Sequence, residues 1–239
     1  MAKIENAKPK NSSGGYSRLV HDPQMADIFT KAQSTVITNG TELEKIISSQ
    51  AKVINNLDTF IKDVTASKDG SMNGTYLCVK KIVKNSKYKM DNHEPDFIVF
   101  IVAEDRICDI IELKDGDSFD TKKSTSEYES LKAFTNHLAP QIPFRVKYYI
   151  CCFNQCDKSK IISGFKNRFT EDQVMTGREF CELLGISYDN IVNSREQDAI
   201  DNFNYVVHEL TKISAVRHAV KEDTLKHISE NDFYEPYGL

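Results

Sequence analysis

Several residue types and patterns are scarce in this chain of 239 residues. It has no tryptophan, six prolines and ten glycines, and it contains no low-complexity tract, which places it among ordinary globular chains. No apolar run is long enough to span a membrane, and the first residues lack the apolar region of a secretory signal peptide. We therefore expect a cytoplasmic protein whose length suffices for one well-buried domain.

The six cysteines lack the spacing of a metal site. No two of them form a C-x-x-C pair and no histidine stands at zinc-ligand spacing, so we expect no structural zinc. Several lie inside apolar runs, where cysteine usually behaves as a small buried hydrophobic residue. This usage favours a reduced compartment. The cysteines are Cys78, Cys108, Cys151, Cys152, Cys156 and Cys181.

What stands out is a pair of apolar, β-rich runs at residues 96–103 and 107–114, separated by the short polar segment 104–106. Two such runs around a polar turn predict a β-hairpin, here with a three-residue loop. Because side chains alternate between the two faces of a strand, every second residue of each run shares a face. On one of these faces the apolar residues end in a small group of charges.

That group consists of Asp96 at the start of the first strand and Glu112 and Lys114 at the end of the second. A turn centred on Asp105 places Asp96 opposite Lys114, and a turn centred one residue earlier places it opposite Glu112. Both registers gather the three groups at one corner. Two carboxylates so close repel each other unless a cation lies between them, and Mg²⁺ prefers such oxygen ligands. The alternative is a hairpin whose terminal charges only mark where burial stops.

Pro95-Asp96, followed in a strand-turn-strand context by Glu112-Leu113-Lys114, resembles the PD-(D/E)XK signature of many type II restriction endonucleases. The resemblance covers roughly residues 90–155. It implies an α/β fold: a restriction-endonuclease-like core with a central mixed β-sheet flanked by helices, plus N- and C-terminal helical elaborations. It also implies that Asp96 and Glu112 hold one or two Mg²⁺ ions, while Lys114 binds the scissile phosphate and helps to position water.

The N-terminal part of the chain predicts two helices. One follows Asp22-Pro23 and ends before Gly40, and the second runs from Thr41 to about residue 65 on a continuous apolar stripe. Glu44 stands three residues after Thr41, which is the spacing of a capping box. Related nucleases often add an acid from an N-terminal helix to the metal site, so Glu44 is also a candidate metal ligand.

After the hairpin, the pattern predicts a helix over residues 125–138 and a strand over 146–153, which together form a right-handed, parallel β-α-β crossover. A short helix capped by Thr176 and ended by Gly185 comes next, and a final helix spans residues 199–220. For the domains, we expect a flexible arm at 1–20 and a single nuclease domain at 21–239, with its catalytic core at about 75–155.

The net charge of −4 provides no global attraction for nucleic acid, so local patches must supply it. Residues 80–89 hold five lysines and no acid. A solvated surface is the usual explanation, but this run leads directly into the acidic corner, and we favour contact with a DNA backbone. Two more lysines follow the hairpin, beside a second D-x-K pattern at Asp120 that lacks an apolar strand. The candidate DNA-binding lysines are Lys80, Lys81, Lys84, Lys87, Lys89, Lys122 and Lys123.

The resemblance and the charges together predict a Mg²⁺-dependent type II restriction enzyme that cuts double-stranded DNA at a specific site. We expect a homodimer, because a two-fold enzyme matches a palindromic site and cuts both strands, and a DNA methyltransferase as genetic partner. Two other functions stay open. One is a resolvase-like repair or recombination nuclease of the same superfamily, and the other is a non-catalytic DNA-binding module.

Overall fold

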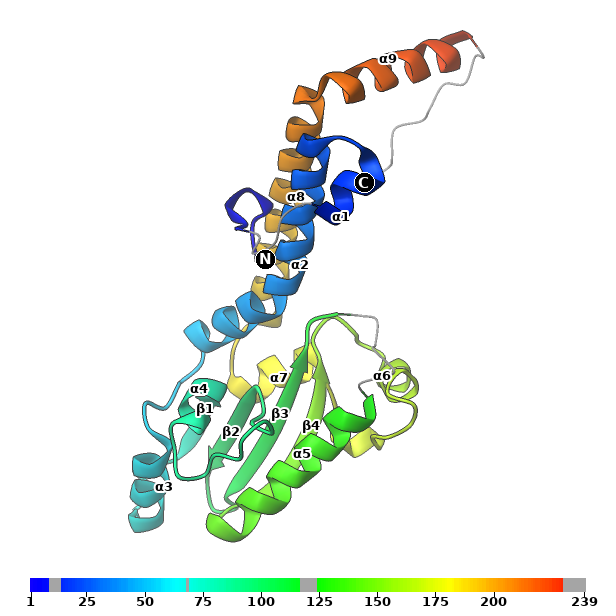
Figure 1. Cartoon of the computed structure of the whole chain (residues 1–239). Helices are drawn as coiled ribbons and strands as arrows, with labels where there is room; N and C mark the ends of the chain where they lie inside the picture. Colours follow the sequence, from blue (N-terminus) through cyan, green and yellow to red (C-terminus); the bar gives the residue numbers. More distant parts are fainter. Residues whose placement is uncertain (9–13, 68, 117–123, 230–239) are drawn as a thin grey trace. The chain divides into compact units, whose positions relative to one another are not determined.

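The computed structural model describes residues 1–8, 14–67, 69–116 and 124–229 (Figure 1). The chain forms two compact units: Gly40–Val192 make up the first, and Met1–Asn39 together with Asn193–Leu239 make up the second. We call them the sheet unit and the helical unit. They do not coincide with the predicted arm of residues 1–20 and domain of residues 21–239, so those domain boundaries stay a prediction.

The sheet unit is built on five strands in the spatial order β1-β2-β3-β4-β5. The first three pair antiparallel, and β3, β4 and β5 pair parallel, so the predicted mixed sheet flanked by helices is confirmed. The sequence did not predict β5, which is only three residues long. The strands are β1 Gly74–Val79, β2 Phe97–Val102, β3 Ile107–Lys114, β4 Arg145–Cys152 and β5 Val174–Thr176.

The central hairpin adopts the register that places Asp96 opposite Glu112, since Phe97 pairs with Ile111. This register pairs Ile101 with Ile107 at the loop end and leaves residues 103–106 outside the strands. The loop therefore has four residues, and the predicted three-residue loop is wrong. Pairing the two isoleucines keeps apolar side chains together and leaves the polar residues to the turn.

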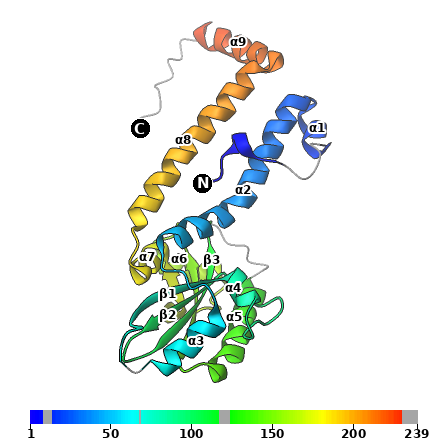
Figure 2. The ribbon, with the colours of Figure 1, turned by 90° about the vertical axis from the view of Figure 1, so that its left-hand side faces the viewer.

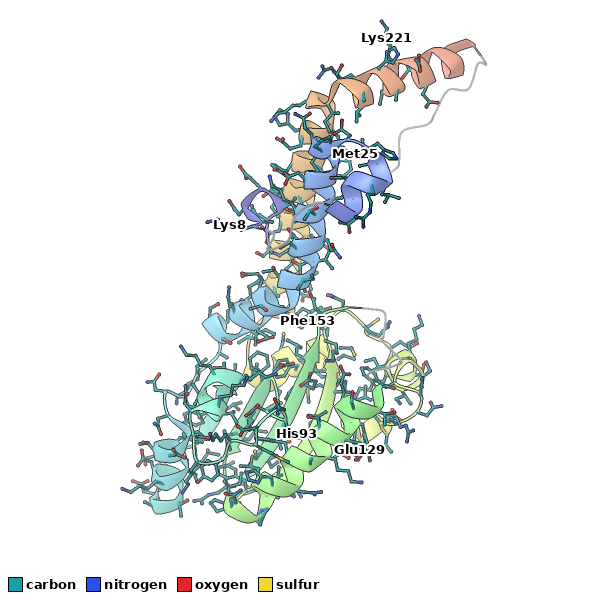
Figure 3. The ribbon with its side chains drawn as sticks, viewed as in Figure 1. Lys8, Met25, His93, Glu129, Phe153 and Lys221 are labelled. Carbon is teal, nitrogen blue, oxygen red and sulfur yellow. The ribbon has the colours of Figure 1, made fainter. Side chains whose placement is uncertain are left out.

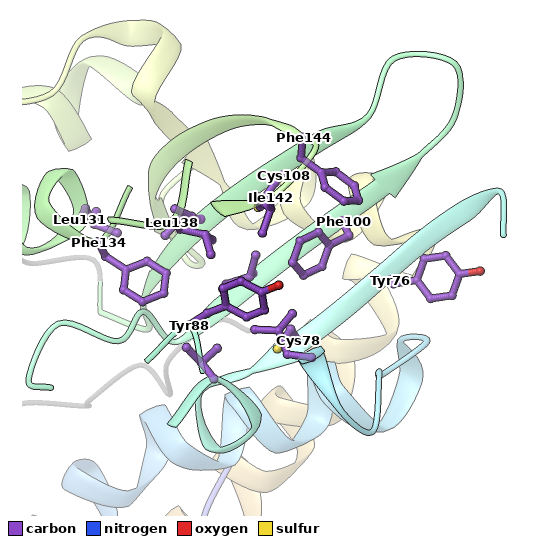
Figure 4. Packing of buried hydrophobic residues seen from close by; sticks show 14 of the residues in the cluster. Tyr76, Cys78, Tyr88, Phe100, Cys108, Leu131, Phe134, Leu138, Ile142 and Phe144 are labelled. Carbon is purple, nitrogen blue, oxygen red and sulfur yellow. The ribbon is translucent and has the colours of Figure 1, made fainter. Parts of the chain in front are cut away.

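One face of the sheet packs against α3 Leu57–Ala66, α5 Ser124–Leu138 and α6 Lys158–Gly164. Alternate hairpin residues such as Ile98, Phe100 and Ile110 form its centre and are fully buried. Figure 4 shows part of this core, in which the ring centroids of Phe100 and Phe144 lie 5.1 Å apart. The predicted alternation of the hairpin thus places the face that continues to Asp96 and Glu112 on the side of α5.

The other face packs against α7 Gly177–Leu184 and the last turns of α2, which contribute Leu43 and Ile47. Phe97 of β2 meets Phe180 of α7 with ring centroids 5.7 Å apart. In Figure 2, α3 and α5 lie on one side of the sheet and α7 lies on the other. The sheet is therefore buried on both faces, as its continuous apolar strands require.

The helix predicted to end before Gly40 is longer: α2 spans Pro23–Gln50. Gly40 lies inside it, where an added Cβ would meet no atom within 4 Å. A glycine inside a helix costs only about 1 kcal/mol, and burial of Leu43 and Ile47 on the following turns outweighs this. Thr41 therefore opens no helix, and its predicted capping box with Glu44 is wrong.

The single helix predicted from Thr41 to residue 65 is also wrong. The chain leaves the helix after Gln50, and residues 51–56 run alongside β1 before α3 begins at Leu57. Leu77 of β1 donates its N–H to Lys52 O and accepts one from Ile54 N, each at 2.9 Å. The apolar stripe continues through this extended segment, so its periodicity hid the break.

Downstream, the predicted helix and parallel strand are confirmed as α5 and β4, and α7 is capped by Thr176 and ends at Gly185 as predicted. Gly177 is required by packing, because a Cβ there would lie 2.3 Å from the carbonyl oxygen of Phe153. The remaining short elements of this unit are α4 Lys80–Lys84, the 3₁₀ turns η2 Ala139–Gln141 and η3 Glu171–Gln173, and the first residues of α8 Tyr188–Lys212.

The helical unit contains η1 Ile4–Asn6, α1 Gly14–Val20, most of α2 and α8, and α9 Ser214–Ser229. The predicted final helix over residues 199–220 is wrong, because it breaks at the buried Ile213. Arg217 stabilises the break by donating to Thr211 O at 2.9 Å and to Lys212 O at 2.7 Å.

The first residues of the chain pack on α8 within this unit. The N-terminal ammonium pairs with Asp198, and Lys3 pairs with Asp201 at 2.5 Å. The helices of the described residues do not include one that is long and apolar enough to cross a membrane.

Candidate active site

Asp96 lies just before β2 and is held from two directions. Its Oδ2 accepts the backbone N–H of Leu113 at 3.0 Å, and its carbonyl oxygen accepts the N–H of Lys80 at 3.1 Å. The side chain is only 12% exposed. The end of β3 and the start of α4 therefore fix the position of this carboxylate.

Glu112 and Lys114 lie at the end of β3, and their side chains point to the same face of the sheet, as predicted. Lys114 Nζ lies 2.9 Å from Glu112 Oε1 and 2.8 Å from Oε1 of Glu127, which belongs to the first turn of α5. Lys80 completes the group, with its Nζ 3.1 Å from Asp96 Oδ1. Two ammonium groups thus stand between three carboxylates.

Glu44 reaches the same corner from α2. Burial raises its pKa, and the negative charges of Asp96 and Glu112 raise it further, against the opposing effect of Lys80 and Lys114. The pKa of Glu112 is likewise raised by burial and then by Asp96. The buried neighbours Leu43 and Ile47 hold this turn of the helix against the sheet. The three predicted acids therefore share one electrostatic environment.

The lysines respond in the opposite sense. Burial lowers the pKa of Lys80 and of Lys114, but the surrounding carboxylates outweigh it, so both pKa values are raised. Both side chains therefore stay charged. They neutralise acids that would otherwise repel one another at this corner.

The donor set suits a hard divalent cation, because Glu44, Asp96 and Glu112 offer only carboxylate oxygens. Burial and then mutual repulsion raise the pKa values of Glu44 and Glu112, and a bound cation relieves that repulsion. Within the described ranges, no three His, Cys, Asp or Glu side chains already form a metal-binding group. In this conformation Lys80 and Lys114 provide the positive charge.

A cavity of about 320 Å³ adjoins the corner, between the segment before β2 and the start of α5. His93, labelled in Figure 3, lines it and has its Nδ1 3.1 Å from Ser130 Oγ. The cavity is large enough to admit a phosphate group beside Glu112 and Lys80. Its lining residues are Lys80, Asn92, His93, Glu94, Glu112, Ser126, Glu127 and Ser130.

The lysine run of residues 80–89 divides into two parts. Lys80 is half-buried against Asp96, whereas the side chains of the other four are exposed on α4 and the following turn. The exposed members are Lys81, Lys84, Lys87 and Lys89. Lys122, Lys123 and the second D-x-K pattern at Asp120 lie outside the described residues.

Sequence reasoning missed Glu127. Its signal was present, since Glu127 precedes Leu131, Phe134 and Leu138 at helical spacing and so belongs to the face of α5 that meets the sheet. An acid on an otherwise buried stripe, at the end nearest Glu112 and Lys114 of β3, is the pattern that would have found it.

Comparison with known proteins now adds to this geometry. The type II restriction enzyme HhaII of Haemophilus parahaemolyticus is 45% identical over 226 residues, which cover 93% of this chain and 99% of HhaII. This chain belongs to the family of type II restriction enzymes. It is thus a site-specific deoxyribonuclease whose substrate is DNA. The family resemblance inferred from the hairpin agrees with this result as far as restriction enzymes are concerned.

The match to HhaII also decides between the functions that the sequence left open. A restriction enzyme is favoured over a resolvase-like nuclease and over a non-catalytic module. No protein-family model matches the chain, and no solved structure matches it. The family membership of this restriction enzyme therefore rests on a similarity that runs along almost the whole chain.

Proposed function

We propose that this restriction enzyme is a PD-(D/E)XK nuclease that cuts double-stranded DNA by Mg²⁺-dependent hydrolysis at the corner of Asp96, Glu112 and Lys114. The observation that carries the proposal is the Leu113 N–H bond to Asp96 Oδ2. It fastens the first acid beside the strand that bears the other two residues. Charged groups crowded on an apolar support are typical of functional sites.

The proposed metal ligands are Asp96 and Glu112, with Glu44 as a third. When bound, Mg²⁺ would lower the pKa of a water molecule and neutralise charge that develops on the phosphate. Lys114 then has a separate task. Its ammonium donates hydrogen bonds to the scissile phosphate and orients the attacking water. Lys80 holds Asp96 while DNA is absent, and its half-exposed side chain can turn to a phosphate oxygen.

The exposed lysines Lys81, Lys84, Lys87 and Lys89 are proposed to bind the DNA backbone next to this corner. They would set the affinity and its salt dependence rather than the sequence that is read. Lys122 and Lys123 stay candidates for the same role.

We also propose that the enzyme acts as a homodimer, because two symmetric active sites can cut both strands of a palindromic site. Its genetic partner would be a DNA methyltransferase that protects the same site in host DNA. Both proteins would work in the cytoplasm, where incoming and host DNA meet.

The test is digestion of plasmid DNA by the purified enzyme with Mg²⁺ and with a chelator. We expect discrete bands only with Mg²⁺. The variants Asp96→Asn and Lys114→Ala should lose about 10³-fold or more in cleavage rate while still binding DNA, because they remove interactions made to the reacting groups.

Asp105→Asn is the matched control. Asp105 lies at the exposed opposite end of the same hairpin, so its variant should cleave like the wild type. Cleavage by Asp96→Asn at the rate of Asp105→Asn would remove the proposed site from consideration, and full cleavage in chelator would remove the metal.

A further inference from the structure

The exposed large hydrophobic side chains of the described residues are confined to the helical unit. The sheet unit is much larger, yet its large hydrophobic side chains are all buried or half-buried. Apolar side chains that gather on one part of a surface usually mark a binding site. They are Leu19, Val36, Ile37, Ile200, Phe203, Val207 and Val220.

Three of them form a stripe along α8. Ile200, Phe203 and Val207 follow one another at spacings of three and four, so they project from the same side of the helix. Their exposed fractions are 53%, 68% and 42%. The stripe has the period of a helix that packs against another helix, but it faces outward.

The surface beside this stripe carries no formal charge, and the exposed Glu196, one helical turn before Ile200, marks its end. From Gln197 to Thr211, the exposed residues of α8 include no Asp, Glu, Lys or Arg. The three acids of this stretch lie on another side of the helix: Asp198 and Asp201 pair with the first residues of the chain, and Glu209 pairs with Lys212. The exposed residues of α8 here are Gln197, Ala199, Ile200, Phe203, Asn204, Val207, His208 and Thr211.

The exposed residues of Gln197–Thr211 form a surface that we call the neutral face. A DNA backbone requires cations, so a face without lysine or arginine is unsuited to it.

We propose that the neutral face is the surface through which two copies of this chain form a dimer. Resting on the proposed function, the argument is that both strands must be cut, which requires two copies related by a two-fold axis. In a two-fold interface the same patch lies on both sides, so the patch must complement itself. A charged patch would repel its copy, whereas an uncharged apolar one buries well against itself.

The test is sedimentation equilibrium of Phe203→Glu and Ile200→Glu beside the wild type. We expect the wild type to be dimeric and each variant to dissociate with a dissociation constant raised roughly 100-fold, as for a central interface residue. Val220→Glu is the matched control, because Val220 is 59% exposed on α9 outside the neutral face. It should remain dimeric. Far-UV circular dichroism shows that each variant is folded.

Plasmid cleavage adds a second readout: dissociated Phe203→Glu should accumulate nicked circles where the wild type yields linear DNA. A monomeric wild type, or variants as dimeric as the control, would overturn the proposal. This result is independent of the nuclease site, since Asp96→Asn should stay dimeric even if the catalytic proposal fails.

A separate observation concerns Glu127. Its carboxylate lies 2.8 Å from Lys114 Nζ, and its side chain is only 18% exposed. It comes from α5, whose buried Leu131 and Phe134 fix the helix on the sheet. Lys114 is therefore held from two sides, by Glu112 on its own strand and by Glu127 on another element.

We infer that Glu127 is a positioning residue for Lys114. Under the proposed function, Glu112 binds the metal and can no longer hold the ammonium fully. Glu127 then remains as the carboxylate that keeps Lys114 aimed at the phosphate. This role predicts an effect on turnover rather than on DNA binding.

The test compares Glu127→Gln and Glu127→Ala with Glu129→Ala, an exposed acid of the same helix that Figure 3 labels. We expect kcat to fall about 10- to 100-fold with KM unchanged, as for residues that orient catalytic groups. Glu127→Gln should keep part of the activity, because its amide oxygen still accepts a hydrogen bond. Glu129→Ala should be unaffected.

A change in KM alone, or equal activity of Glu127→Ala and Glu129→Ala, would refute the positioning role. Should Lys114→Ala itself cut DNA normally, the proposed mechanism fails instead, and the two failures are thus distinguishable.

Discussion

The two units of this restriction enzyme use apolar residues in opposite ways. The sheet unit encloses two cores, one on each face of the sheet, and contains nearly all of the fully buried side chains. The helical unit buries few hydrophobic residues, among them Ala26, Ile28 and Ile213, and exposes large ones. The first unit is therefore stabilised mainly by its own interior, whereas the second leaves large apolar side chains exposed.

Two phenylalanines give the strongest test of this difference. Phe100 is fully buried in the sheet unit, and Phe203 is 68% exposed in the helical unit. Phe100→Ala should lower the free energy of unfolding by about 3–5 kcal/mol, and Phe203→Ala by less than about 0.5 kcal/mol. Urea unfolding at a protein concentration where the wild type is monomeric measures both. Equal losses would contradict the contrast between the units.

The second prediction uses Asp109, a buried residue of β3 whose Oδ1 has no hydrogen-bond partner. Burial raises its pKa to about 6, against the opposing charges of Lys147 and Arg145. A raised pKa means that the folded state binds the proton more tightly than the unfolded state. The destabilisation is therefore absent below the ordinary value of 3.8 and complete above about 6.

Asp109→Asn should accordingly stabilise the enzyme by up to about 3 kcal/mol at pH 8 and leave it nearly unchanged at pH 3.5. The measurement is the difference in unfolding free energy between variant and wild type across this range. A difference that stays constant with pH would show that the pKa of Asp109 is the same in the folded and unfolded states.

The third prediction tests how closely the sheet unit is packed. Gly177→Ala places a methyl group against the carbonyl oxygen of Phe153, at the end of β4. Backbone atoms cannot move aside cheaply, so we expect a loss of about 1–3 kcal/mol in the free energy of unfolding. Thermal unfolding measures it, and an unchanged midpoint would mean that α7 can shift away from β4.

Gly40→Ala is the counterpart with the smallest expected effect and the opposite sign. Gly40 lies inside α2 with no atom within 4 Å of an added Cβ. Alanine should stabilise the helix by about 0.5–1 kcal/mol, because it loses less backbone entropy on folding. The same thermal unfolding experiment serves for this variant, in which destabilisation would reveal a contact at Gly40.

The sequence predicted the parts of the fold whose signals are local. The hairpin, α5, β4 and α7 each carry their own alternation, period or caps. It failed where one pattern fits two structures. The stripe from Leu43 to Val64 continues across residues 51–56, although these leave the helix to pair with β1. Asn56, whose Oδ1 caps α3 by accepting Thr59 N–H at 2.9 Å, was the local signal of the break.

The part of the candidate site that lies on the hairpin was predictable from local signals as well. Asp96, Glu112 and Lys114 follow from strand alternation alone, and the structure brings them together. The contacts of Lys80 and Glu127 could not be derived that way. They depend on how α4 and α5 dock against the end of the sheet, which is a matter of tertiary packing.

The hydrogen bond from Leu113 N–H to Asp96 links the candidate site to the folding of the sheet. It exists only in the adopted register, since the alternative register would set Asp96 against Lys114. An incompletely paired chain therefore does not hold Asp96 at the end of β3. Under the proposed function, a newly made chain would gain nuclease activity only once its sheet is complete.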